Sequence, residues 1–202
     1  KSGAQYDAQY VICTVPIGVL KHGDITFTPQ LPKDKRKAFE SDLQMNVLDK
    51  AVMIFPNKFW DNTQFIGSIP NAHLNPETNQ WINKDNWPAY VNLHFYTNKP
   101  ILIAFTSGNF ALKMEEQTDK TITNNIMAIL RKTYGKNIPN PTKVIITRWK
   151  KDPYSRGSYT SLTTKALPNN EDLKILDRPE AKGHLVFAGE GTNTEYSTTV
   201  HG

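Results

Sequence analysis

Lys50 is the residue whose position most invites a chemical role, because it interrupts the apolar stretch NVLDKAVMIF. Lysine is seldom buried unless its ammonium group is paired. A cation fixed inside such a strand could stabilise negative charge that develops on a reacting group. A structural explanation is also available, since Lys50 could lie at the edge of a sheet or pair with the neighbouring Asp49. The pattern alone favours that structural explanation.

Three aromatic residues lie close together in the stretch RWKKDPYSRGSYT: Trp149, Tyr154 and Tyr159. They surround a proline and a glycine, which is typical of a turn. Aromatic side chains on such a turn can line a ligand pocket, and they can equally anchor a hydrophobic core. The spacing does not decide between these two roles.

The sequence ends on HLVFAGEGTNTEYSTTVHG, where a short apolar run leads into a polar turn that carries Glu190. The run is typical of a buried strand. A carboxylate directly after a strand can accept hydrogen bonds from the hydroxyl groups of a ribose or a ribityl chain, as in dinucleotide sites. A plain helix cap is the structural alternative for Glu190.

The motifs of several common enzyme classes do not occur in the sequence. A dinucleotide fingerprint needs three glycines in the pattern GxGxxG, but Gly189 and Gly191 are followed by Thr194 at the third position. No phosphate loop and no GxSxG nucleophile turn is present. The single cysteine, Cys13, indicates a small buried hydrophobe. No metal site is expected, because the histidines show no ligand spacing; they are His22, His73, His94, His184 and His201.

The composition indicates a soluble globular protein, with 202 residues of which 38% are hydrophobic and 21% are charged. The net charge is +5, but the basic residues are spread along the chain apart from the short clusters KDKRK and RWKKD. A nucleic-acid surface concentrates its basic residues on one face, so no nucleic-acid partner is expected. No stretch approaches the length of a membrane span.

The elements that must position these residues follow from hydrophobic periodicity. The clearest is a helix over residues 119–134, which Thr118 or Asp119 can cap and Gly135 can end. A second helix is predicted over 32–43, a long loop over 70–88, and a hairpin connection at 97–100. Strands are predicted over 9–16, 47–56, 64–69, 89–96, 100–108, 143–149 and 184–189. Strands in groups with a few helices predict an α/β or α+β fold.

Five ordered segments of the sequence resemble the C-terminal part of the flavin-containing amine oxidases. That family includes polyamine oxidases, monoamine oxidases and lysine-specific histone demethylases. The segment YVICTVPIGVLKHGDITFTPQLPKDKRKAF is similar to the family's VPLGVLK…F.P.LP..K stretch, and RWKKDPYSRGSYT is similar to RW..DPYSRGSYS. The resemblance is nearer to the polyamine oxidase and histone demethylase branch than to the monoamine oxidases. The five segments cover residues 10–39, 46–61, 90–119, 148–160 and 185–202.

The resemblance implies a fragment of a two-domain fold. Residues 1–43 and 168–202 would belong to a Rossmann-like FAD-binding domain, and residues 44–167 to a substrate-binding domain with a mixed sheet and flanking helices. The N-terminal GxGxxG part of the FAD domain would lie outside this chain. The chain on its own is therefore expected to be catalytically silent.

The resemblance also implies a role for individual residues. Lys50 would hold a water molecule near the flavin and assist its reoxidation by O2, and Tyr159 would form one aromatic wall around the amine. Thr199 stands where monoamine oxidases have a second tyrosine wall. The expected catalytic residues are therefore Lys50, Tyr159 and Thr199. Gly191 and Ser197 depart from the usual family residues. The expected FAD-binding residues are Thr14, Val15, Pro16, Trp149, Tyr154, Glu190, Thr199 and Val200.

The function implied by the resemblance is FAD-dependent oxidation of a small-molecule amine, with a polyamine as the favoured substrate. The amine would become an imine, and O2 would be reduced to H2O2. Two alternatives remain open, a binding scaffold without catalysis and an L-amino-acid oxidase of the same fold. The latter needs an arginine to bind the substrate carboxylate, for which Arg148 and Arg156 are the candidates.

Overall fold

The computed structural model describes residues 3–69, 72–75, 80–83, 87–163 and 171–201. The chain folds as two compact units, each with its own hydrophobic core. We call Val47–Trp149 the sheet unit, and Lys1–Asn46 together with Lys150–Gly202 the split unit. These divisions differ from those expected after residues 43 and 167. Which segments bind a cofactor and which bind a substrate stays a prediction.

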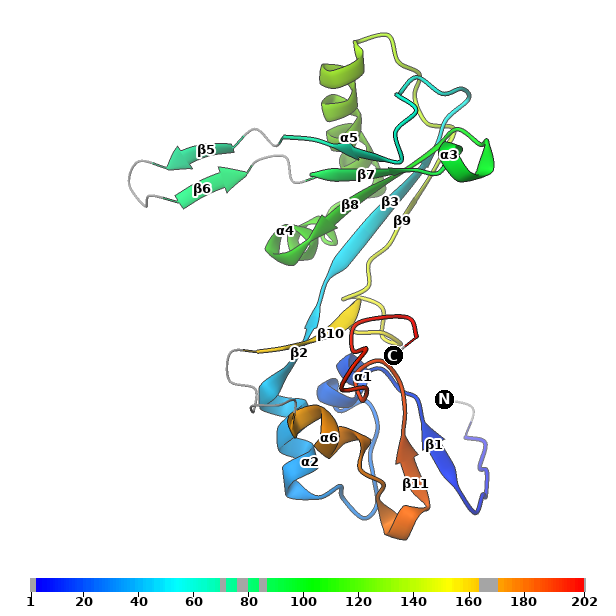
Figure 1. The fold of residues 1–202 in the computed structure, drawn as a ribbon, viewed down its shortest axis with the longest axis vertical. Coiled ribbons are helices and arrows are strands. Elements are labelled where there is room, and N and C mark those ends of the chain that lie inside the picture. The colour runs from blue at the N-terminus through cyan, green and yellow to red at the C-terminus, as the bar shows by residue number, and fades with distance from the viewer. Residues whose placement is uncertain (1–2, 70–71, 76–79, 84–86, 164–170, 202) are drawn as a thin grey trace. The chain divides into compact units, whose positions relative to one another are not determined.

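The sheet unit is built on a five-stranded sheet with the strand order β4-β7-β8-β3-β9 (Figure 1). Its strand pairings are antiparallel. The side chains of β3 alternate between buried and half-buried, because successive residues of a strand point to opposite faces. The strands are β3 Leu48–Ile54, β4 Phe65–Gly67, β7 Ala89–Asn92, β8 Ile101–Ser107 and β9 Lys143–Ile146.

Helix α5 (Asp119–Tyr134) packs its apolar side against this sheet and confirms the helix predicted over the same residues. The Thr118 hydroxyl caps its start by accepting the Thr121 N–H at 3.2 Å, and Gly135 ends it with a φ of 100°. Its buried residues are Ile122, Ile126, Met127 and Leu130. Two shorter helices, α3 (His94–Thr97) and α4 (Gly108–Met114), flank β8 in the chain.

Three predictions for the secondary structure need correction. The strand predicted over 89–96 ends at Asn92, because the buried Asn92 amide oxygen accepts the His94 N–H at 3.1 Å and the chain turns into α3. The predicted loop over 70–88 contains the hairpin β5 (Ala72–Asn75) and β6 (Gln80–Asn83). The helix predicted over 32–43 is α-helical only as α2 (Lys33–Lys37) and continues as a π-helical turn, η1 (Ala38–Asp42).

The split unit combines two small sheets with short helices (Figure 1). Strand β1 (Val11–Cys13) runs parallel to β11 (Leu185–Phe187), and β2 (Leu43–Asn46) runs antiparallel to β10 (Tyr159–Leu162). Together with the sheet unit, this mixture of sheets and helices confirms the predicted α/β class. The remaining helices are α1 Ile17–His22, α6 Glu171–Asp177 and the 3-10 turn η3 Ala181–Gly183.

Lys35 is fully buried in the split unit. Its ammonium group donates to the carbonyl oxygens of Leu176, at 3.0 Å, and Arg178. It also lies 3.4 Å from the Glu180 carboxylate and 4.3 Å from the centre of the Phe187 ring. Burial lowers the pKa of this ammonium group, and the charge of Glu180 opposes that shift. Lys35 therefore joins α2 to the end of α6 and to β11.

Candidate functional site

The polar turn that follows β11 is anchored by the Glu190 carboxylate. Its Oε1 atom accepts two hydrogen bonds from Thr160, one from the backbone N–H at 3.0 Å and one from the hydroxyl at 2.5 Å. Its Oε2 atom accepts the Thr198 N–H at 3.0 Å. Thr198 has a φ of 68°, which is uncommon for a residue other than glycine. Glu190 therefore holds a strained turn against strand β10.

The end of this turn presents its side chains to the surface. The Asn193 amide oxygen accepts the N–H groups of Glu195 and Tyr196, at 2.9 and 2.7 Å, which closes a local loop. The Thr199 hydroxyl donates to the Tyr196 carbonyl at 2.7 Å. Val200 is fully exposed. An exposed apolar residue beside fixed polar groups suits contact with a flat ring system.

Gly191 is required by close packing. A Cβ atom at this position would lie 2.4 Å from Cγ1 of Ile17 and 3.0 Å from the Thr160 hydroxyl oxygen. The glycine thus lets the turn approach α1 and Thr160 at the same time. The packing around position 191 in this chain therefore leaves no room for a larger side chain.

The turn that precedes Tyr159 is held by an ion pair and a second tight glycine. Arg156 donates to both carboxylate oxygens of Asp24, at 3.0 and 3.3 Å, and this hydrogen bonding lowers the pKa of the Asp24 carboxyl group. Gly157 has a φ of 148°, and a Cβ atom there would lie 2.6 Å from Cβ of Met45. The half-buried Tyr159 begins β10 directly after this turn, while Tyr154 is 84% exposed.

The predicted contacts at Thr14, Val15 and Pro16 lie between β1 and α1. The Ala188 N–H donates to the Cys13 carbonyl at 3.1 Å, so this segment runs beside the start of the polar turn. The Pro16 carbonyl begins α1 by accepting the N–H groups of the next turn. Thr14 and Pro16 are exposed.

Lys50 lies in the sheet unit, where β3 has β8 on one side and β9 on the other. It is therefore not at a sheet edge. No ion pair with Asp49 is found in the described structure, and the two side chains point to opposite faces of β3. The Lys50 ammonium lies 5.7 Å from the centre of the Phe105 ring. Neither structural explanation that the sequence offered for Lys50 applies.

Asp49 is fully buried and organises the segment around Trp149. Its Oδ1 atom accepts the Thr147 hydroxyl at 2.8 Å and the Trp149 N–H at 3.2 Å. The Lys50 N–H in turn donates to the Thr147 hydroxyl oxygen at 2.8 Å. Oδ2 of Asp49 and the hydroxyl of Thr106, which is its register partner on β8, are both buried without a hydrogen bond in the described structure.

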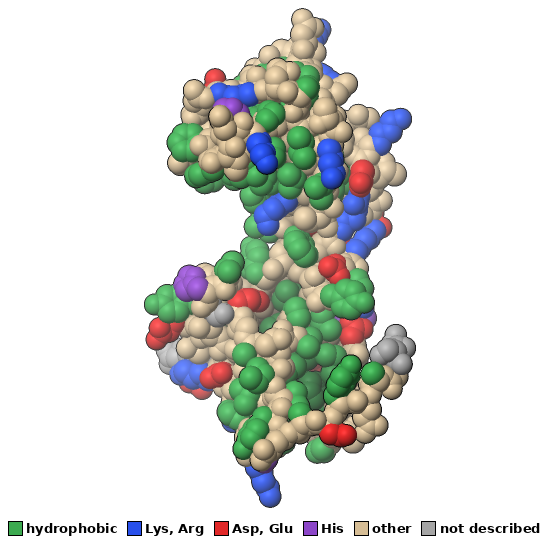
Figure 2. All heavy atoms as spheres, turned by 90° about the vertical axis from the view of Figure 1, so that its right-hand side faces the viewer, with side chains coloured by type: hydrophobic (Ala, Val, Ile, Leu, Met, Phe, Trp, Pro, Cys, Tyr) green, Lys and Arg blue, Asp and Glu red, His purple; other side chains and the backbone are tan. Residues whose placement is uncertain are grey.

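The structure gathers most of the predicted site residues in the split unit. Those are Thr14, Val15, Pro16, Tyr154, Tyr159, Glu190, Thr199 and Val200, whereas Lys50 and Trp149 belong to the sheet unit. Figure 2 shows hydrophobic side chains gathered on one face of the split unit, and its exposed apolar residues include Val11 and Ile12 of β1. Sequence reasoning missed Thr160, and no local pattern marks it, because its partner Glu190 is 30 residues away.

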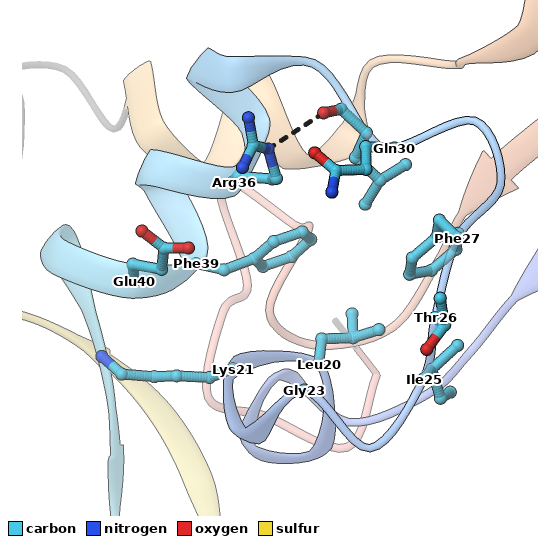
Figure 3. A pocket seen from close by; sticks show the side chains of 11 residues that line it. Leu20, Lys21, Gly23, Ile25, Thr26, Phe27, Gln30, Arg36, Phe39 and Glu40 are labelled. Carbon is cyan, nitrogen blue, oxygen red and sulfur yellow. Dashed lines mark hydrogen bonds between the residues drawn. The ribbon is translucent and has the colours of Figure 1, made fainter.

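Two cavities of the split unit lie apart from these residues. One, of about 270 Å³, has Phe27 and Phe39 at its apolar walls and Arg36 and Glu40 at its rim (Figure 3). The other, of about 420 Å³, is lined by Gly18, Gln44, Met45 and four basic residues, which are Lys21, His22, Lys150 and Arg156. None of the residues predicted to be catalytic or to bind FAD lines either cavity, whereas Arg156, a candidate for binding a substrate carboxylate, lines the second one.

In the described part of the chain, no group of three or more histidine, cysteine, aspartate or glutamate residues is placed to hold a metal ion. Its helices include none that is long and apolar enough to cross a membrane.

The family model described as flavin containing amine oxidoreductase matches residues 1–202. Protein FLOWERING LOCUS D from Arabidopsis thaliana is 34% identical over 202 residues, which cover 98% of this chain and 24% of that protein. Lysine-specific histone demethylase 1 homolog 1 from Oryza sativa subsp. japonica is 34% identical over 199 residues, which cover 95% of this chain and 22% of that protein. The chain thus spans about a quarter of the length of these relatives.

Two solved structures share the fold. Wild-type putrescine oxidase bound to putrescine matches with a TM-score of 0.72 and 17% identity, over 94% of this chain and 39% of that one. Cyclohexylamine oxidase from Brevibacterium oxydans IH-35A matches with a TM-score of 0.63 and 17% identity, over the same shares of the two chains.

Proposed function

Because the chain belongs to the flavin-containing amine oxidoreductase family, we propose that the protein containing it oxidises a carbon–nitrogen bond of an aliphatic amine, with FAD as its cofactor. The observation that carries this proposal is the Glu190 turn. Its carboxylate is fixed by Thr160 and Thr198, and it ends at the exposed Val200. A fixed carboxylate beside an apolar surface fits a cofactor that has both a hydroxyl-bearing chain and a flat ring.

The residues of the split unit fit FAD as follows. Glu190 would accept a hydroxyl of the ribityl chain on Oε2, which has one donor among the described residues, the Thr198 N–H, and a second acceptor position. Thr199 and Val200 would lie beside the ring, and the segment 14–16 would give backbone contacts. FAD, when bound, supplies the acceptor for the hydride, which carries two electrons away from the amine. The protein residues bind, orient and exclude water around it.

Tyr159 would orient the amine, since an aromatic face attracts a cationic or polarised nitrogen. Lys50 would hold a positive charge where O2 takes up electrons, and so favour the formation of H2O2. Trp149 and Tyr154 would flank the cofactor. In this proposal, the Asp49 hydrogen bonds to Thr147 and Trp149 keep the Lys50 segment in place.

The substrate class that we favour is a methylated lysine side chain, because one relative at 34% identity and others at 30–32% are named as lysine-specific histone demethylases. A polyamine, the substrate favoured by the sequence, is the second candidate. Both are aliphatic amines on flexible chains, and Thr199 in place of a second aromatic wall leaves room for a chain rather than a small aryl ring.

An amino-acid substrate has less support. It requires an arginine that is available to bind the carboxylate. Arg156 is engaged by Asp24. Arg148 donates to the carbonyls of Glu115 and Gln117 and to the carboxylate of Asp119. Both candidate arginines therefore already hold parts of their own unit together.

The test uses the full-length protein. Its visible absorbance spectrum is recorded, and it is then titrated without oxygen with a dimethyl-lysine histone peptide and, separately, with spermine. We expect a flavin spectrum that the peptide bleaches. A protein without flavin would refute the proposal and favour a binding scaffold, whereas bleaching by spermine alone would select the polyamine.

Two variants separate the roles. Lys50→Met should slow reoxidation of the reduced flavin by O2 by more than about tenfold, the scale of losing one electrostatic contact. Tyr159→Ala should weaken amine turnover more than flavin retention. Lys99→Met, which removes an exposed lysine of the same unit as Lys50, is the matched control. Normal reoxidation in Lys50→Met would remove Lys50 from the proposed site.

A further inference from the structure

We propose that Thr160 is a positioning residue for the cofactor site. It fixes the Glu190 carboxylate so that Oε1 is used by the protein and Oε2 stays open to a hydroxyl group of the cofactor. This inference rests on the proposed function, because it takes FAD as the ligand. It assigns a role to a residue that neither the motifs nor the resemblance singled out.

The hydrogen bonds that the Glu190 carboxylate accepts are divided unequally between its two oxygens. A carboxylate oxygen has two good acceptor positions. Both positions of Oε1 are filled by Thr160, through its N–H and its hydroxyl. Among the residues that the structure describes, only the Thr198 N–H donates to Oε2, so within that part of the chain one position is left. The described residues therefore leave the carboxylate a single acceptor position, and Thr160 decides which oxygen offers it.

The surroundings of the Thr160 hydroxyl direct its proton toward Glu190. Thr160 is 1% exposed, so water does not compete for its proton. Its other acceptor is the thioether sulfur of Met45 at 3.6 Å, which is much weaker than a carboxylate. Gly191 makes this approach possible, since a Cβ there would lie 3.0 Å from the same hydroxyl oxygen. The hydroxyl has one strong partner and is held toward it.

The backbone N–H of Thr160 links the Glu190 carboxylate to Tyr159. The N–H that binds Oε1 belongs to the peptide unit that joins Thr160 to Tyr159. In β10 the two side chains point to opposite faces, so Tyr159 is left free to face an amine. The same carboxylate thus fixes the turn proposed to hold the cofactor and the backbone of the residue proposed to hold the substrate.

The experiment measures FAD affinity of the full-length apoprotein by quenching of flavin fluorescence. Thr160→Val removes the hydroxyl and keeps the shape and the backbone N–H. We expect its FAD dissociation constant to rise about ten- to a hundredfold, the effect of losing one hydrogen bond to a charged partner. Thr160→Ser restores the hydroxyl and should stay within about threefold of wild type. Thr133→Val, an exposed threonine of α5, is the matched control.

A double substitution distinguishes positioning from a general loss of folding. Once Glu190→Ala has removed the carboxylate, adding Thr160→Val should change the FAD affinity by less than about twofold. An equal loss in both backgrounds would show that Thr160 acts on the fold and would overturn the inference. So would wild-type affinity in Thr160→Val, or a failure of Thr160→Ser to restore binding. A wild-type protein that binds no FAD refutes the proposed function itself, and this inference with it.

Discussion

Replacing the buried Lys35 by methionine tests how the split unit holds its helices together. Methionine keeps most of the length of the side chain and can contact the Phe187 ring through its sulfur. It cannot donate to the carbonyls of Leu176 and Arg178. We therefore expect Lys35→Met to loosen the end of α6 and the strand β11 that follows it.

The expected magnitude comes from opposing effects. Removing one partner of a buried charged pair typically destabilises by about 3–5 kcal/mol. The loss should be smaller here, because the Glu180 carboxylate keeps the Arg178 guanidinium at 3.2 Å and is 14% exposed. The cost of burying the ammonium is also removed. What remains is the loss of the donor to the carbonyls of Leu176, which is buried, and Arg178, which is only partly buried, so we expect a loss of about 2 kcal/mol.

Hydrogen exchange of the full-length protein, followed by mass spectrometry, measures this loss locally. Peptides covering residues 171–187 should exchange about thirtyfold faster in Lys35→Met, since about 1.4 kcal/mol corresponds to a factor of ten. Lys33→Met, an exposed lysine of the same helix, should leave their exchange unchanged. Unchanged or slower exchange in Lys35→Met would show that the buried ammonium costs as much as its hydrogen bonds contribute, and would refute this reasoning.

Three further predictions follow from single groups. Asp49→Asn should stabilise the sheet unit by about 1 kcal/mol, because the amide can donate toward the Thr106 hydroxyl, where Oδ2 has no partner among the described residues; a lower melting temperature would contradict this. Gly157→Ala should destabilise the turn before Tyr159, because Gly157 has a φ of 148° and an added Cβ would meet Met45. This loss of stability should be measurable as faster hydrogen exchange of residues 155–160. The Arg178 guanidinium lowers the pKa of Asp34 to about 2, so its contribution to stability is present above about pH 4 and is lost as the pH falls toward 2. Asp34→Asn should flatten that part of the acid unfolding curve, and an unchanged curve would remove Asp34 from it.

The elements that the sequence predicted well are those with a local cause. Helix α5 has an apolar stripe, a capping Thr118 and a terminating Gly135, all within its own stretch. Strand β3 was predicted despite Lys50, because apolar and β-branched residues surround it. The strand over 89–96 was overextended, because Asn92, which ends it by accepting the His94 N–H, is held in its buried position by Trp60, 32 residues earlier in the chain. Such a contact has no signature in the local pattern.

In the candidate site too, what the local sequence determines could be predicted, and what depends on contacts between distant residues could not. The residue types at Lys50, Tyr159 and Glu190 can be recognised from the sequence, and the resemblance gives each a role. The residues that fix them cannot be recognised in this way, because they act across the fold. Asp24 holds Arg156 across 132 positions of the chain, and Thr160 meets Glu190 across 30.

The two units divide the proposed chemistry in a way that the variants can test together. Glu190 and Thr160 belong to the split unit, and Lys50 belongs to the sheet unit. If cofactor binding resides in the split unit, Thr160→Val should change FAD affinity and leave the reoxidation of flavin that remains bound unaffected. Lys50→Met should slow reoxidation and leave the affinity unchanged. Two variants that each change both quantities would mean that the roles are not divided between the units, and the assignment of Lys50 to the oxygen reaction would then have to be abandoned.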